Sequence, residues 1–364
     1  MKSLTQFAKT RLHEHQITIN QSLDTYLAEV FGKGAKEYHD AVGYAIDVYK
    51  DIVTRTAKRL RGSFVIEAYR MFTGNVLPDV IQAAVAIELI HAYLLVIDDF
   101  NDKSDLRRGE PTAHRLHERY HKEKLSLGDS LHYGYSTATL SGLAGMHHAG
   151  NLLLGLHFPP KTLLRALHGI NDAINVTAYG QIRDIYNQQI LTVSEADVLE
   201  VHRLKTAHYT YFNPIQLGAV LADQSEETIQ KFTTYTKQAG IAFQIQDDIL
   251  GVYGDPHDTG KSNKDDIMEG KATLLSVYAL QHGSDLQKKT LRAALGNREL
   301  SDSDFEAIQQ ILVETGSLQH SKEVAHHLVV KAKESLYREF PDYTESEGFK
   351  FIAGVADYMI ERKL

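Results

Sequence analysis

The sequence of 364 residues has no cysteine, few prolines and no excess of positive charge, and each absence narrows its function. Without cysteine, neither a disulfide framework nor a thiolate metal site is possible. The net charge of −8 gives no basic surface for nucleic acid or an anionic membrane. The nineteen histidines are scattered and form no HExxH motif. The amino terminus lacks the apolar core of a signal peptide, so we expect a soluble, cytoplasmic protein.

The seven prolines lie where long helical patterns end. No strand-like alternation is flanked by hairpin dipeptides, and no repeat or composition shift divides the chain. With 43% hydrophobic residues, the chain can bury a large core. These features predict an all-α fold, either as one large helical domain or as two smaller ones.

The most informative stretch is 81–114, in which an almost entirely apolar run ends in a cluster of aspartates, Asp98, Asp99, Asp102 and Asp105. Buried without partners, such carboxylates cost several kcal/mol each. A hard cation between them would make them tolerable, and oxygen-only ligands suit magnesium. An exposed acidic helix end is the alternative for a single motif of this kind. The run is not a membrane span, because Glu88 and His91 interrupt it and it is shorter than about 20 residues.

Helix geometry sharpens this prediction. At about 100° per residue, Asp98 and Asp102 project from one face, and Asp99 is turned away. His91 lies two turns earlier on nearly the same line. One face of an apolar helix therefore carries a carboxylate pair and an imidazole.

A second stretch, 241–275, repeats the pattern of an apolar helix that ends in paired aspartates, Asp247 and Asp248. Several lysines follow it, among them Lys261, Lys264 and Lys271. Two opposed acid-tipped helices can hold magnesium ions around a diphosphate, and flanking cations can hold a second diphosphate. Three further features are open to two interpretations. The basic cluster at 58–61 could be a solvated face, or it could belong with the acidic helix that follows it by about one helical hairpin. Lys205-Thr206 could point outward to solvent or hold an anion, and Gln181 with Asp184 could be a buried polar pair or a ligand contact.

Over roughly residues 35–360 the sequence resembles the trans-isoprenyl diphosphate synthases of the polyprenyl synthetase family. IDDFNDKSDLRRGEPTAH resembles the first aspartate-rich motif with its RRG, and FQIQDDILGVYGDPHDTGKSNKDDIMEGKATLL resembles the second. AKRLR, LKTAHY and YGQIRD resemble three further family elements in the same order. The resemblance implies a single isoprenoid synthase domain over 1–364, a large bundle of antiparallel helices around a central cavity, with 1–34 as a helical leader. It also implies a homodimer.

Two positions depart from the family pattern. Ala57 stands where the family has glycine in its GKRLR element, and Gly251 replaces the last aspartate of the second DDxxD. The second change could remove one magnesium contact or make it water-mediated.

The resemblance also implies the role of each matching residue. Asp98 and Asp102 would bind two magnesium ions and Asp247, with Asp248 beside it, a third. Thr206 and Gln244 would line the reacting centre. Arg107, Lys205 and Lys261 would help to hold the allylic diphosphate, and Lys58, Arg61, His91 and Arg108 would hold isopentenyl diphosphate. Lys271 would also bind substrate.

Product length would be set by Tyr93 and its neighbour Leu94, which lie just before the first motif. In the family, an aromatic residue five positions before the motif stops growth at short products, and this pattern favours geranylgeranyl diphosphate. Farnesyl diphosphate or a longer product is the alternative. The other classes weighed are a non-catalytic partner subunit, for which Gly251 is the only hint, and a terpene cyclase, which needs no isopentenyl site. A purely structural helical bundle would have no use for two acid-tipped apolar helices.

Overall fold

The computed structural model describes residues 3–31, 35–190, 192–255 and 262–361. The predicted all-α fold is confirmed, since strands in the described part of the chain are confined to the two-residue β1 (Leu106–Arg107) and β2 (Glu110–Pro111). These pair antiparallel directly after the first acidic motif.

The helices of the first half are α1 (Leu4–Phe31), α2 (Ala35–Tyr38), α3 (Asp40–Thr54), α4 (Leu60–Thr73), α5 (Pro78–Asn101), α6 (Ala113–Lys124), α7 (Ser130–Leu154) and α8 (Pro160–Asn187). Those of the second half are α9 (Glu195–Val201), the π-helix η1 (His202–Phe212), α10 (Asn213–Leu221), α11 (Glu226–Gln230), α12 (Thr233–Tyr253), α14 (Asp265–Glu269), α15 (Leu274–His282), α16 (Asp285–Ala294), α17 (Asp302–Glu314), α18 (Ser317–Glu339), the 3-10 helix η2 (Pro341–Tyr343) and α19 (Glu347–Ile360).

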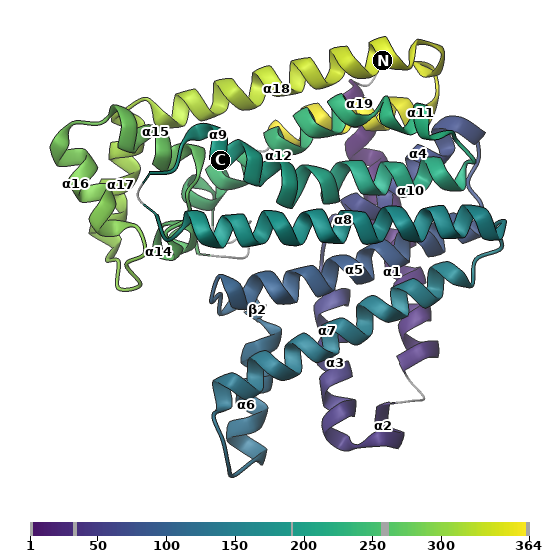
Figure 1. Ribbon diagram of the computed structural model, residues 1–364, viewed down its shortest axis with the longest axis horizontal. Coiled ribbons are helices and arrows are strands. Elements are labelled where there is room, and N and C mark those ends of the chain that lie inside the picture. Colours follow the sequence, from purple (N-terminus) through teal and green to yellow (C-terminus); the bar gives the residue numbers. More distant parts are fainter. Residues whose placement is uncertain (1–2, 32–34, 191, 256–261, 362–364) are drawn as a thin grey trace.

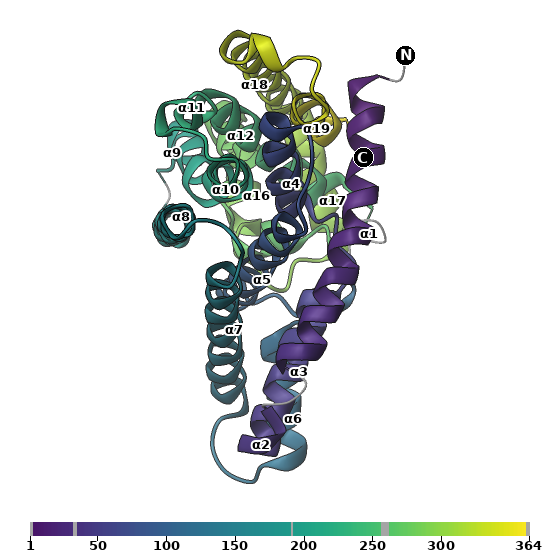
Figure 2. The same ribbon diagram turned by 90° about the vertical axis from the view of Figure 1, so that its right-hand side faces the viewer.

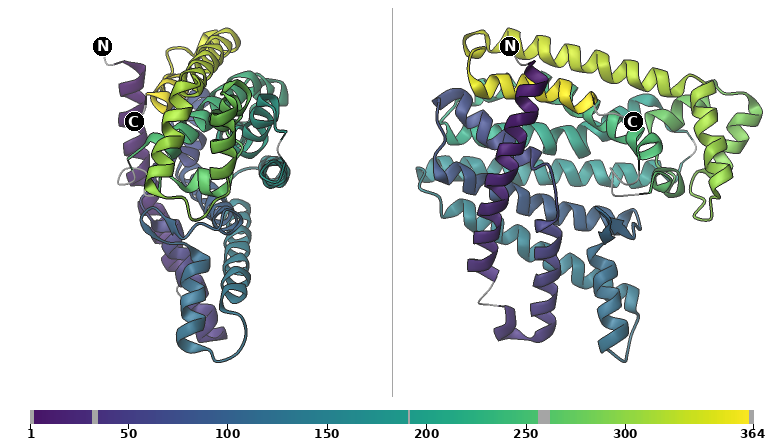
Figure 3. Two further views of the ribbon diagram at one scale, coloured as in Figure 1. Left: turned by 90° about the vertical axis from the view of Figure 1, so that its left-hand side faces the viewer. Right: turned by 180° about the vertical axis from the view of Figure 1, so that it is seen from behind.

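The long helices form a bundle in which α18, α12, α10, α8, α5 and α7 run roughly along the long axis of the molecule (Figure 1). Seen from the side, α7 and α8 lie at one edge and α1 at the opposite edge (Figure 2). From behind, α1 crosses the bundle steeply and contacts α19, α4 and α5 (Figure 3). Helix α1 lies within the predicted leader, and its buried face, which includes Ala8, Leu12 and Ile19, belongs to the core.

Helix α5 is the central element of the fold. Pro78 occupies its first turn, where the missing backbone N–H costs nothing. The helix is long and apolar enough to cross a membrane, but most of it is buried in the bundle, as expected for the core helix of a soluble protein. Its buried Glu88 is paired with Arg59 at 3.4 Å, so the charge that interrupts the apolar run is satisfied inside the protein.

The helical run from α9 to α10 is continuous but contains eleven residues of π-helix, η1. Wide turns of this kind are rare and occur mostly at functional sites. Pro214 follows directly inside this run, so it does not end a helix as the sequence predicted. The run carries Lys205 and Thr206 on the face that looks toward α5 and α12.

Candidate active site

A cavity of about 1280 Å³ lies between α4, α5, α8, η1 and α12. Asp98 from the first acidic motif and Asp247 from the second both line it, although they are far apart in the sequence. The other residues to which the resemblance assigns a role also line this cavity, apart from two. Asp102 is buried beside it, with only 3% of its surface exposed. Lys261 lies outside the described residues.

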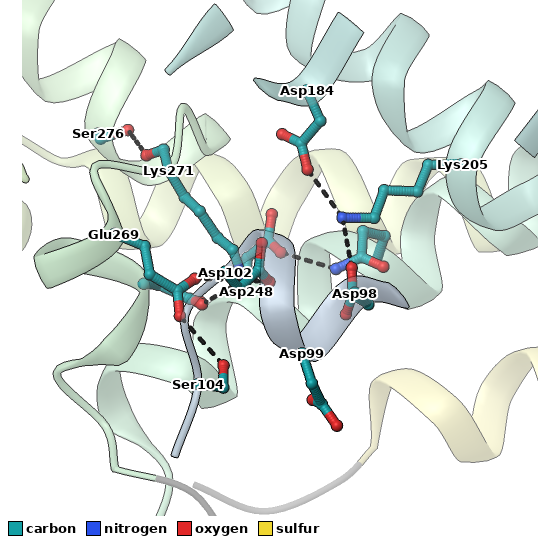
Figure 4. Close-up of polar contacts among 12 residues, drawn as sticks. Asp98, Asp99, Asp102, Ser104, Asp184, Lys205, Asp248, Glu269, Lys271 and Ser276 are labelled. Atoms are coloured by element: carbon teal, nitrogen blue, oxygen red, sulfur yellow. Dashed lines mark hydrogen bonds and ion pairs between the residues drawn. The ribbon is translucent and has the colours of Figure 1, made fainter. Parts of the chain in front are cut away.

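The first acidic motif occupies the C-terminal end of α5. Asp98 lies in the last turn and Asp102 is the C-cap residue, one position beyond the helix. Asp99 points away from both (Figure 4), as its helical position predicts, and forms a buried ion pair with Arg107. Arg107 also lies 3.5 Å from Asp98, so one guanidinium fixes both carboxylates.

The second motif divides into an exposed and a buried carboxylate. Asp247 faces the cavity. Asp248 is buried and accepts a hydrogen bond from Gln244 Nε2 at 2.8 Å, and His202 Nε2 lies 3.1 Å from its other oxygen. Thr206 Oγ1 donates to Gln244 Oε1 at 2.7 Å, which links η1 to α12. Burial raises the pKa of Asp248 although His202 opposes this shift.

Two lysines pair with the carboxylates of the first motif and with acidic residues of α8 and α14. Lys205 Nζ lies 3.1 Å from Asp98 and 2.8 Å from Asp184 (Figure 4). Lys271 Nζ contacts three carboxylates, Asp102 at 3.1 Å, Asp266 at 3.1 Å and Glu269 at 2.9 Å. Burial alone would lower the pKa of each lysine, but the carboxylates outweigh it and raise both pKa values. Both lysines are therefore fully charged.

The donor set suits magnesium. The carboxylates of both motifs supply hard oxygen ligands, and the chain has no thiolate. Asp102 Oδ1 is buried and accepts no hydrogen bond from any described residue, so it retains a free acceptor. Within the described ranges, no three carboxylate or imidazole groups are already close enough together to hold a metal. The lysines stand between them, so binding a metal would require these side chains to move.

A basic patch forms another wall of the cavity and includes Lys58, Arg61, His91, Arg107 and Arg108. Arg61 donates to Thr210 Oγ1 at 2.7 Å, lies 3.0 Å from His91 Nε2, and stacks 4.8 Å from the centre of the Tyr209 ring. Burial, with Arg61 and Arg108 nearby, lowers the pKa of His91 well below its usual value. The imidazole is therefore neutral, and its Nε2 can accept a hydrogen bond from Arg61.

Arg108 is held in an unfavourable position. Burial, followed by repulsion from Arg59 and Arg107, lowers its pKa to about 10. Its backbone is left-handed, with φ at +59°, which costs about 1 kcal/mol or more for a residue with a side chain. Its Nη1 donates to the carbonyl oxygen of Arg55 at 3.0 Å. A bound anion would relieve this electrostatic cost.

The two departures from the family pattern have different consequences. A Cβ atom at Gly251 would lie 2.2 Å from Asp266 Oδ2, so Asp266 fills the space that a side chain at 251 would need. At the other position, the carbonyl oxygen of Ala57 accepts a hydrogen bond from Gln16 of α1, and the basic residues that follow still reach the cavity.

Sequence reasoning assigned no role to three residues of this site, His202, Asp266 and Glu269, and it left Asp184 open as a buried polar residue or a ligand contact. The motif YGQIRD contains Asp184, and the lysine-rich end of the second motif contains the two acidic residues, but neither pattern revealed their lysine partners. His202 lies three residues before Lys205 and carries no recognisable signal.

The apolar end of the cavity lies between α5 and α8. Tyr93 and Leu94 line it, as predicted, together with Ile97, Ile174 and Ala178. These residues give the cavity an apolar wall that could contact the hydrocarbon chain of a substrate.

Comparison with known proteins gives a consistent result. Residues 44–312 match the family model described as polyprenyl synthetase. The chain is 31% identical to the geranylgeranyl diphosphate synthase of Saccharolobus solfataricus, with 86% of this chain and 88% of that protein covered. It is 30% identical to the geranylfarnesyl diphosphate synthase of Natronomonas pharaonis, with 78% and 75% covered. Among solved structures, the fold resembles geranylgeranyl pyrophosphate synthase from Corynebacterium glutamicum complexed with isoprenyl diphosphate and magnesium, with a TM-score of 0.83, 29% identity and both chains fully covered.

Proposed function

This chain belongs to the polyprenyl synthetase family and is a prenyltransferase, and on that premise we propose that it condenses isopentenyl diphosphate with an allylic diphosphate to give geranylgeranyl diphosphate. The single observation that carries the proposal is that Asp98 and Asp247 share one cavity with a basic patch and an apolar wall. The part of the cavity with the acidic motifs would hold the allylic diphosphate, and the basic patch would hold isopentenyl diphosphate. We assign the protein to the cytoplasm.

The carboxylates of the two motifs are the proposed metal ligands. Asp98, Asp102 and Asp247, with Asp248 in support, would hold three magnesium ions. When bound, magnesium would neutralise the negative charge of the diphosphate leaving group. The family is magnesium-dependent, and Asp102 Oδ1 is a buried acceptor without a hydrogen-bond donor among the described residues.

The protein's own cations would complete the leaving-group site. Lys205 and Arg107 already lie beside Asp98, and Lys271 lies beside Asp102. Their positive charge would stabilise the negative charge that develops on the diphosphate as its C–O bond breaks. Lys261, outside the described residues, would add one more cation.

The basic patch would hold the second substrate. Lys58, Arg61 and Arg108 would bind the diphosphate of isopentenyl diphosphate, with neutral His91 fixing Arg61. The alkene carbon of isopentenyl diphosphate forms a bond to the allylic cation, and a proton then leaves to the departed diphosphate. Thr206 and Gln244, linked by a hydrogen bond, would line the reacting centre. The apolar wall would keep water away from the cation.

Tyr93 supports a product of twenty carbons because it lines the cavity before the first acidic motif, where its ring would limit the length of a growing chain. We expect Tyr93→Ala to lengthen the product. A geranylfarnesyl product is the second candidate, because two of the relatives that are 30% identical carry that name. The basic patch argues against a terpene cyclase, and the two acidic motifs on one cavity argue against a non-catalytic subunit.

A second copy of the chain is the proposed partner. Exposed apolar residues follow one face of α8 at helical spacing, namely Tyr179, Ile182 and Tyr186, and Leu140 and Leu143 are exposed on the adjacent α7. This edge of the molecule (Figure 2) would be covered in a homodimer. Sedimentation velocity tests this proposal, and a monomer at micromolar concentration would contradict it.

The activity is tested with purified protein, magnesium, labelled isopentenyl diphosphate and dimethylallyl, geranyl or farnesyl diphosphate. Chromatography of the dephosphorylated products should give a linear alcohol of twenty carbons. A cyclic hydrocarbon would support the cyclase instead, and the absence of turnover with every primer would support a partner subunit.

A further inference from the structure

We propose that Gly142 of α7 is a specificity-determining residue, because its missing side chain lets the ring of Tyr93 lie back from the apolar end of the cavity. This inference rests on the proposed function, in which Tyr93 limits product length. Gly142 does not line the cavity and would act only through Tyr93, so it is a positioning residue.

The contact between the two residues is close. Helices α5 and α7 pack against each other along their lengths (Figures 1 and 2). A Cβ atom built on Gly142 would lie 2.8 Å from Tyr93 Cδ2, 3.6 Å from Cε2 and 3.7 Å from the Tyr93 Cα. Carbon atoms in favourable contact are about 3.5–4.0 Å apart. Any side chain at 142 therefore requires the Tyr93 ring to move.

The surroundings decide where the ring can go. Ala92 and Val96, on the same helix, are almost completely buried, so the α5 backbone is fixed in the core. Tyr93 is only partly buried, and the open space beside it is the cavity that it lines. A side chain at 142 would therefore push the ring into the cavity and shorten the space for the product.

Helix α7 also provides a matched control. Gly145 lies about one turn further on, and a Cβ atom there would meet the ring of Tyr49, 2.1 Å from Cζ. Tyr49 donates a hydrogen bond to the carbonyl oxygen of Leu89 at 2.7 Å and does not line the cavity. Gly145→Ala should therefore disturb packing without changing the product. A Cβ atom on Gly150 would meet no other atom within 4 Å, so Gly150→Ala controls for the effect of replacing a glycine by alanine within α7.

The test compares product distributions and thermal unfolding of the wild type, Gly142→Ala, Gly145→Ala, Gly150→Ala, Tyr93→Ala and the double variant Tyr93→Ala/Gly142→Ala. We expect Gly142→Ala to form more of the product that is one isoprene unit shorter. The ratio of this shorter product to the main product of the wild type should rise at least several-fold. Gly145→Ala should lower the melting temperature and leave the distribution unchanged. Gly142→Ala should also lower the melting temperature, because its side chain meets the Tyr93 ring. In the double variant, the products should match those of Tyr93→Ala, and this loss of thermal stability should disappear.

Two results would overturn the inference. One is an unchanged product distribution in folded Gly142→Ala, while Tyr93→Ala lengthens the product. The other is that Gly142→Ala shortens the product, or lowers stability, equally in the presence and absence of the Tyr93 ring. If Gly142→Ala alone does not fold, recovery of folding in the double variant still supports the contact, and its absence refutes it. A wild type that forms no prenyl diphosphate would instead refute the proposed function.

Discussion

Arg108→Gln should make the unliganded protein more stable and weaken its binding of diphosphate. Arg108 is partly buried near Arg59 and Arg107, and its pKa is lowered from 12.5 to about 10. Such a shift corresponds to roughly 3 kcal/mol. At neutral pH the guanidinium is charged in both the folded and the unfolded chain, so this free energy is a cost to the folded state at every pH below about 10.

The substitution removes this cost but also removes one hydrogen bond. Arg108 Nη1 donates to the carbonyl oxygen of Arg55, and losing such a bond costs about 1 kcal/mol. Glutamine is uncharged and shorter than arginine, and it does not change the strained backbone at this position. The net expectation is a free energy of unfolding about 1–2 kcal/mol higher than in the wild type.

Binding should change in the opposite direction. A hydrogen bond between charged groups is worth about 1.5–3 kcal/mol, so the KM for isopentenyl diphosphate should rise roughly 10- to 150-fold. Denaturant unfolding with and without inorganic diphosphate measures both effects, because a ligand that binds only the folded state raises the free energy of unfolding. The control is Arg338→Gln, on α18, whose guanidinium is exposed and paired with Glu339.

A variant that is less stable than the wild type without ligand, yet gains the same stability from diphosphate, would refute this reasoning. It would mean that Arg108 is satisfied within the protein and has no role in holding an anion.

Four further predictions follow from the same geometry. Asp247→Asn should lower kcat/KM about 10²- to 10³-fold and raise the magnesium concentration needed for half-maximal rate; an unchanged magnesium titration would remove it from the ligand set. Gly251→Asp should lower stability and weaken activation by magnesium, because the new carboxylate meets Asp266, and Asp266→Ala should restore both. His114 and His117 are completely buried, and burial lowers the pKa of each to about 4. Their contribution to the free energy of unfolding is complete above pH 6.5, the pKa of histidine in the unfolded chain, and is lost as pH falls toward 4. His117→Phe should therefore make the free energy of unfolding, measured with denaturant, decline less steeply as pH falls. Chelation of magnesium should abolish calorimetric binding of a non-hydrolysable allylic analogue and spare that of isopentenyl diphosphate; loss of both would contradict separate sites.

Helical periodicity was sufficient to predict which side chains share a face where the helix is regular. It placed Asp98 and Asp99 on different faces of α5, and in the structure one lines the cavity and the other is paired with Arg107. It also grouped Asp102 with Asp98, which assumed that the helix continues. The helix ends at Asn101, so Asp102 is a C-cap whose side chain is buried against Lys271. Whether Asp102 lies inside the helix depends on a shift of one residue in the helix end, and apolar spacing alone cannot locate a helix end that closely.

Long-range pairing could not be predicted in the same way. Lys205 and His202 lie in a π-helix, whose wider turns change which residues share a face, so an α-helical projection misplaces them. Lys271 joins three carboxylates that come from two parts of the chain. Such pairs depend on how the helices pack, and no local pattern encodes that packing.

The two ends of the cavity differ in how their charges are balanced, and this difference argues for the assignment of substrates. At the acidic end, Lys205 and Lys271 already neutralise carboxylates that would otherwise repel one another. At the basic end, Arg108 is destabilised by its cationic neighbours and gains from any anion. An anion alone can therefore bind at the basic end. At the acidic end, a diphosphate must bind together with cations, because the carboxylates repel a diphosphate that has no bound cation. This difference supports the proposal that the substrate whose diphosphate leaves binds at the acidic end, where added cations would also stabilise its departure.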